Sequence, residues 1–98
     1  MSGRRLVGLI GTNIGQSLSP FLHEDAFAAA GVIGHYHLMD VSVLQGRRLE
    51  DLLAAARTAG FAGVNVTHPF KEAVIPLLDT VSAEAREIGA VNTVVFDR

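Results

Sequence analysis

The segment VNVTHPFK, residues 64–71, combines side chains that suit acid–base chemistry on a polar ligand. Asn65 and Thr67 alternate with two valines, so at a strand end the valines can enter the core while the amide and the hydroxyl face a crevice. Of the 8 lysine and arginine residues, only Lys71 is a lysine. A lysine releases its proton more readily than an arginine, so Lys71 is a candidate general acid or base.

Lys71 also stands where structure alone does not favour a cation. The run PFKEAVIPLL, residues 69–78, predicts a short helix that begins at Pro69 and is disturbed at Pro76. A cation in the first turn of a helix is disfavoured by the helix dipole, so a structural role does not explain the ammonium group. The alternative is that an arginine-rich composition left one lysine by chance.

The run SLSP places two hydroxyls where they can act together. Ser17 and Ser19 are two residues apart, so an extended loop would point them in the same direction. Ser19 followed by Pro20 predicts a helix start, and hydroxyls beside a helix N-terminus can hold a carboxylate. The alternative interpretation is that Ser19 only caps the helix and Ser17 is solvated.

A second amide lies in the run GAVNTVV, residues 89–95, where Asn92 and Thr93 interrupt apolar residues. A buried amide needs hydrogen-bond partners, which are either neighbouring backbone groups or a hydroxylated ligand. Both interpretations stay open at this point.

Two other patterns are weaker. The glycines of GLIGTNIG do not have the G-x-G-x-x-G spacing of a dinucleotide turn, and phosphate binding at GTNIG is a minor alternative. The histidines do not form a recognisable ligand set, so we expect no metal site. They are His23, His35, His37 and His68.

Composition limits the class of protein. The 98 residues are 49% hydrophobic and 18% charged, which is typical of one compact domain. The net charge of -2 without a basic stripe argues against nucleic acid as a partner. No apolar run is long enough for a signal-peptide core or a membrane span, so we expect a cytoplasmic protein without membrane contact. The absence of cysteine excludes disulfides.

The elements that must position these side chains alternate between strands and helices. This order predicts an open, mainly parallel (mixed) sheet with helices on both faces, a three-layer α/β/α fold. In such sheets ligands bind beyond the carboxyl ends of the strands, so the loops after Ile10, Val66 and Val91 should share one edge. The predicted strands are 4–11, 32–41, 61–66 and 90–96, and the predicted helices are 19–30, 47–59, 69–78 and 82–88.

Three segments together resemble the N-terminal, substrate-binding domain of shikimate dehydrogenases, including quinate/shikimate dehydrogenases. The likeness extends in order over nearly the whole chain. The segments are GLIGTNIGQSLSPFLHEDAF, GFAGVNVTHPFKEAVIPLLD and EAREIGAVNTVV.

The resemblance implies an NADP-dependent, in some relatives NAD-dependent, reversible reduction of 3-dehydroshikimate to shikimate in aromatic amino-acid biosynthesis. By position, Ser17 and Ser19 match the residues that hold the substrate carboxylate. Asn65, Thr67 and Asn92 match those that bind ring hydroxyls. Lys71 matches the catalytic lysine.

We expect residues 1–98 to form the substrate-binding domain alone. The resemblance also implies what the rest of the protein contains. The family's catalytic aspartate follows the last strand in an Asn-Thr-Asp segment, and a C-terminal domain binds most of the NAD(P). The family includes monomers and homodimers. Asn13 and Gln16 depart from the proline and histidine common before the serine pair, which leaves shikimate or quinate open as the preferred substrate. A non-catalytic shikimate-binding module is the alternative.

Overall fold

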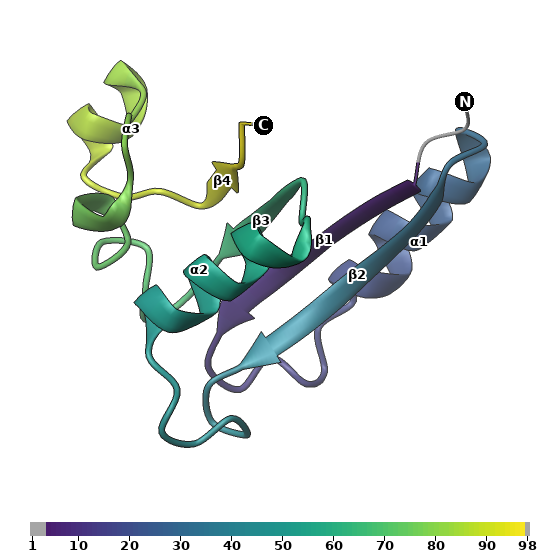
Figure 1. Ribbon diagram of the computed structural model, residues 1–98, viewed down its shortest axis with the longest axis horizontal. Helices are drawn as coiled ribbons and strands as arrows, with labels where there is room; N and C mark the ends of the chain where they lie inside the picture. Colours follow the sequence, from purple (N-terminus) through teal and green to yellow (C-terminus); the bar gives the residue numbers. More distant parts are fainter. Residues whose placement is uncertain (1–3, 98) are drawn as a thin grey trace.

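The computed structural model describes residues 4–97 and contains one four-stranded sheet in the order β2-β1-β3-β4 (Figure 1). The first three strands are parallel, whereas β4 runs antiparallel to β3. The mixed, mainly parallel sheet predicted from the sequence is therefore confirmed. The strands are β1 (Arg4–Gly11), β2 (Ile33–Asp40), β3 (Gly63–Val66) and β4 (Thr93–Val95).

Helices cover both faces of this sheet, which confirms the three layers. In Figure 1, α2 lies in front of the strands and α1 lies behind β2. No helix within residues 4–97 has the length and apolar character needed to cross a membrane. The helices are α1 (Ser19–Ala29), α2 (Leu49–Ala59), α3 (Ala83–Ile88) and the 3-10 turn η1 (Ile75–Leu77).

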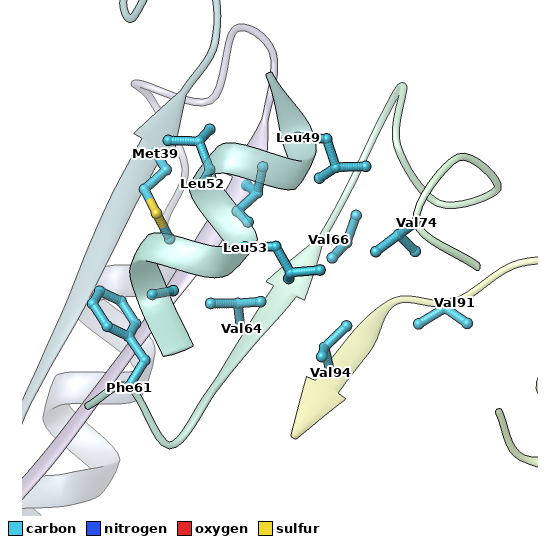
Figure 2. Close-up of a cluster of buried hydrophobic side chains, with 12 residues drawn as sticks. Met39, Leu49, Leu52, Leu53, Phe61, Val64, Val66, Val74, Val91 and Val94 are labelled. Atoms are coloured by element: carbon cyan, nitrogen blue, oxygen red, sulfur yellow. The ribbon is translucent and has the colours of Figure 1, made fainter. Parts of the chain in front are cut away.

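The main core lies between α2 and the sheet (Figure 2). The apolar residues of α2 recur at helical spacing on one side, so a single face of the helix is buried. Burying one such leucine or valine side chain contributes about 1.5–3 kcal/mol, so this layer dominates the stability of the fold. The principal members are Leu49, Leu52, Leu53, Ala56, Phe61, Val64, Val66, Val74 and Val94.

The opposite face of the sheet carries a smaller core and a lighter cover. Leu9, Ile14 and Tyr36 are buried there, while α1 contributes no buried residue. The ring of Phe27 from α1 lies directly over Gly34, where an added Cβ would come within 2.1 Å of the ring. The polar side chain of Asn65 also points to this face, because its neighbours Val64 and Val66 point into the main core.

One edge of the sheet collects the strand ends that the sequence singled out. β1, β2 and β3 end there at Gly11, Asp40 and Val66. β4 runs the other way, so its beginning lies at this edge, where the Val66 amide donates to the Asn92 carbonyl at 3.0 Å. The segment after Val91 therefore reaches the expected edge, although the strand it precedes is not parallel.

The helix predicted for residues 69–78 is wrong. A cis peptide bond joins His68 and Pro69, turns follow, and only Ile75–Leu77 form a helical turn, of the 3-10 type. Pro76 has no N–H to donate, which prevents a regular α-helix through this run. Lys71 lies in a turn, so the argument from the helix dipole does not apply to it.

Candidate functional site

A buried carboxylate shapes the loop that carries the serine pair. Asp40, at the end of β2, accepts hydrogen bonds from the backbone amides of Asn13 and Ile14, both at 3.0 Å. It also accepts from the amide and the hydroxyl of Ser42, at 2.9 and 2.6 Å. The Ser42 hydroxyl bond and these backbone bonds together lower the pKa of Asp40, although burial opposes them. The sequence analysis missed Asp40.

Asp40→Asn should therefore destabilise the loop at neutral pH, because an amide nitrogen would face the buried Ile14 N–H. The pKa of Asp40 lies below its ordinary value of 3.8 in the folded chain, so its contribution to stability is present above that value. The contribution is lost as the pH falls through the folded pKa. Urea unfolding at several pH values should show a lower midpoint for the variant at pH 7 and a weaker acid dependence. Identical acid profiles would contradict this.

The two serines are joined at the start of α1, with Ser17 in the preceding loop and Ser19 as the first residue of the helix. The Ser17 hydroxyl oxygen accepts a hydrogen bond from the Ser19 amide at 3.1 Å, so its own hydrogen remains available to a ligand. Ser19 does not cap the helix: Leu18 occupies the cap position, and no side chain accepts a capping bond there. The interpretation of Ser19 as a mere cap is wrong.

Asn65 is the best connected of the candidate residues. Its side-chain oxygen accepts a hydrogen bond from the Tyr36 hydroxyl at 2.8 Å. Its side-chain nitrogen donates to the Thr93 hydroxyl at 3.1 Å and to the Asn92 carbonyl at 3.4 Å. The structure thus joins Asn65 directly to the segment that carries Asn92, which lies 27 residues further along the chain.

Asn92 lies just before β4 and is exposed, so it is not the buried strand amide that the sequence indicated. Its side-chain oxygen accepts from the Thr93 hydroxyl at 3.2 Å. Its backbone carbonyl accepts from the Val66 amide and from the Asn65 side chain. Its side-chain amide bonds no backbone group among residues 4–97, so the backbone partners that the alternative interpretation expected are not seen. The side-chain nitrogen of Asn92 has no hydrogen-bond partner among residues 4–97, so a ligand or water can bind it.

Thr67 follows β3 on the same face as Asn65 and packs against Gly11. A Cβ added at Gly11 would lie 2.3 Å from the Thr67 Cγ2 atom and 3.2 Å from Ile14. Gly11→Ala should therefore lower the free energy of unfolding by about 1–3 kcal/mol, as overpacking does, and displace Thr67.

Gly15→Ala is the matched control, because no atom lies within 4 Å of an added Cβ there. We expect its free energy of unfolding to change by less than about 1 kcal/mol. Equal urea midpoints for the two variants would contradict the close packing of Gly11 on Thr67.

Lys71 is exposed, and its side chain forms no hydrogen bond or ion pair with residues 4–97. Its carbonyl accepts from the Val91 amide at 2.8 Å, which fixes the turn beside the strand that starts after Asn92. Lys71, Asn92 and Thr93 line one cavity of about 420 Å³. The serine pair lies outside this lining.

The loop after β1 does not suit a phosphate. The Asn13 and Ile14 amides, which a phosphate would need, already donate to the Asp40 carboxylate, whose negative charge would repel an anion. Among residues 4–97, no group of three or more His, Cys, Asp or Glu side chains could hold a metal ion. A dinucleotide would therefore need groups other than this loop.

Comparison with known proteins identifies the relatives of this chain. Residues 9–94 match the family model for the shikimate dehydrogenase substrate binding domain. The quinate/shikimate dehydrogenase (NAD(+)) of Corynebacterium efficiens is 50% identical over 93 residues, which are 93% of this chain and 33% of that protein. The shikimate dehydrogenase (NADP(+)) of Streptomyces avermitilis is 50% identical over 94 residues, 94% of this chain and 32% of that protein.

Solved structures agree with this assignment. The quinate dehydrogenase of Corynebacterium glutamicum in complex with NAD superposes with a TM-score of 0.95 at 45% identity, covering 98% of this chain and 35% of that one. The shikimate dehydrogenase of Thermus thermophilus in complex with NADP(H) and shikimate gives 0.86 at 40% identity, covering 95% and 34%. The chain spans about a third of the length of the curated relatives it matches. It belongs to the family of shikimate dehydrogenase substrate-binding domains.

Proposed function

We propose that residues 1–98 form the substrate-binding domain of a shikimate dehydrogenase whose nucleotide-binding domain follows in the full-length protein. The family match over residues 9–94 supports this proposal, as does the coverage of about a third of each relative. The proposed reaction is the reversible reduction of 3-dehydroshikimate to shikimate, a step toward chorismate and the aromatic amino acids.

One set of hydrogen bonds supports shikimate as the ligand. Tyr36 hydrogen-bonds Asn65, Asn65 hydrogen-bonds the Asn92 segment, and Ser19 at the start of α1 hydrogen-bonds Tyr36. Ser17 is joined to Ser19 through the Ser19 amide. The resulting surface offers two hydroxyls for a carboxylate and two amides for hydroxyl groups. Shikimate carries one carboxylate and several hydroxyls, so the polar groups of this surface match those of the ligand. Thr67 would supply a further contact from its place beside Gly11.

The chemistry follows from the types of side chain. A nicotinamide held mainly by the other domain supplies the hydride that reaches the ketone carbon. Negative charge then develops on the ketone oxygen, and the Lys71 ammonium can stabilise this charge and donate a proton. In the reverse direction neutral Lys71 accepts the proton from the substrate hydroxyl. Exposure of Lys71 at the cavity that Asn92 lines leaves its ammonium accessible to a ligand.

The proposal also covers the cofactor, the oligomeric state, the compartment and the partners of the enzyme. We propose NADP as the cofactor, with NAD as the alternative. One relative named for each cofactor is 50% identical to this chain. That same equality makes quinate oxidation with NAD the second candidate function. A cytoplasmic enzyme that acts as a monomer or homodimer, without nucleic-acid or membrane partners, completes the proposal.

Steady-state assays of the full-length protein test these alternatives. Shikimate with NADP should give a higher kcat/KM than quinate with NAD. The opposite order would favour the quinate enzyme. Shikimate binding without turnover of either pair would favour the non-catalytic module, and an absence of binding would contradict the proposed function.

A further inference from the structure

The hydroxyl of Tyr36 occupies a central place that neither the sequence analysis nor the proposed reaction uses. Tyr36 is 2% exposed and points from β2 toward β3, where it donates to the Asn65 side chain at 2.8 Å. Its ring stacks on His23 of α1 with centroids 4.4 Å apart. Burial raises the pKa of the Tyr36 phenol, although a hydrogen bond with Ser19 opposes the rise, so the phenol stays protonated and remains a donor.

The direction of the hydrogen bonds around Asn65 follows from which groups can only accept. The backbone carbonyl of Asn92 has no proton to give, so the Asn65 group that faces it must be the amide nitrogen. The Asn65 oxygen therefore faces Tyr36, which must donate. The orientation of the Asn65 amide is thus fixed from both sides.

The same direction continues to Asn92. The Thr93 hydroxyl accepts from the Asn65 nitrogen at 3.1 Å and donates its single proton to the Asn92 side-chain oxygen at 3.2 Å. The Asn92 amide nitrogen, which has no partner within the described part of the chain, then points its two N–H groups away from this network. We call this series of Tyr36, Asn65, Thr93 and Asn92 the amide relay.

We propose that Tyr36 is a positioning residue that sets the orientation of the amide relay, so that Asn92 presents N–H donors to the ligand. The site then selects a ligand whose oxygen can accept at Asn92, as a ring hydroxyl can. This inference rests on the proposed function for the identity of the ligand, but the relay itself does not.

Without the phenolic hydroxyl, the Asn65 oxygen would lose its donor. The amide would then be held from one side only, by the contacts of its nitrogen with Thr93 at 3.1 Å and with the Asn92 carbonyl at 3.4 Å, so it would direct the Thr93 proton toward Asn92 less strictly. The donors aimed at the ring hydroxyls would lose their fixed direction. On the carboxylate side only the contact of Tyr36 with Ser19 would be lost, while Ser17 would still accept from the Ser19 amide.

Tyr36→Phe tests this in the full-length protein, because it keeps the ring and its stacking on His23 and removes one oxygen. The KM for shikimate should rise about tenfold, whereas kcat and the KM for the nicotinamide should change less than about twofold. Inhibition by cyclohex-1-enecarboxylate, which has the carboxylate but no ring hydroxyl, should weaken clearly less than the binding of shikimate, because on the carboxylate side only the contact with Ser19 is lost. A parallel loss for shikimate and this inhibitor, or no loss for shikimate, would overturn the proposal.

Thr93→Val provides a second break in the relay, and Thr58→Val on the exposed surface of α2 is its matched control. Thr93→Val should raise the KM for shikimate, and Thr58→Val should not. Because Tyr36 and Thr93 act through the same Asn65 amide, the double variant should lose less than the product of the single losses. Strictly multiplicative losses would contradict the relay.

A readout without substrate separates this inference from the proposed function. In amide NMR spectra of the full-length protein without ligand, Tyr36→Phe should shift the side-chain NH₂ signals of both Asn65 and Asn92. A shift confined to Asn65 would overturn the relay even if shikimate is oxidised. Shifts at both residues in a protein that does not oxidise shikimate would support the relay and contradict the proposed function.

Discussion

Lys71→Met in the full-length protein should lower kcat for shikimate oxidation by about 10²–10⁴-fold, the contribution of a positioned general acid or base. The KM for shikimate should change far less, because the group acts mainly in the transition state. Steady-state kinetics with saturating nicotinamide measure both values. Arg47→Met, which removes an exposed cation from the turn before α2, should leave both unchanged.

Lys71→Arg sharpens this test. The guanidinium keeps the positive charge but does not release its proton at moderate pH, so charge and proton transfer are separated. We expect kcat to stay close to that of Lys71→Met. Near-normal turnover in Lys71→Arg would show that charge alone suffices, and normal turnover in Lys71→Met would remove Lys71 from the mechanism.

Replacing both Ser17 and Ser19 by alanine should raise the KM for shikimate by about 10²-fold or more, because each hydrogen bond to a charged group is worth about 1.5–3 kcal/mol. Turnover at saturating substrate should fall much less. Each single alanine variant also removes one internal contact, since the Ser19 side chain hydrogen-bonds Tyr36 and the Ser17 hydroxyl accepts from the Ser19 amide.

The methyl ester of shikimate provides the matched comparison for the serine pair. It lacks the negative charge but keeps the ring hydroxyls, so the double alanine variant should bind it nearly as well as the wild type does. If the ester and the acid lose affinity equally, the serines do not bind the carboxylate.

Local patterns predicted much of the fold. The alternation around Asn65 correctly put Val64 and Val66 in the core, where each is 2% exposed. α3 begins at the predicted cap, where the Ser82 hydroxyl accepts from the Ala85 amide at 3.1 Å. These features depend on neighbours within a few residues, which is why a single sequence reveals them.

Contacts between distant residues could not be read from the same patterns. Tyr36 meets Asn65 across 29 positions and Asp40 meets Ile14 across 26, so neither role has a local signal beyond a polar group at a strand position. The antiparallel direction of β4 likewise depends on its pairing with β3. The helix predicted at residues 69–78 is absent because Pro76 cannot donate a helical hydrogen bond, so turns lead into the single 3-10 turn Ile75–Leu77.

A crystal structure of the full-length protein with bound shikimate tests the central claim most directly. We expect the carboxylate within hydrogen-bonding distance of both the Ser17 and Ser19 hydroxyls, ring hydroxyls at Asn65 and Asn92, and the Lys71 ammonium against the oxygen on the reacting carbon. Shikimate bound away from the serine pair, or a Lys71 ammonium directed away from the ligand, would contradict it.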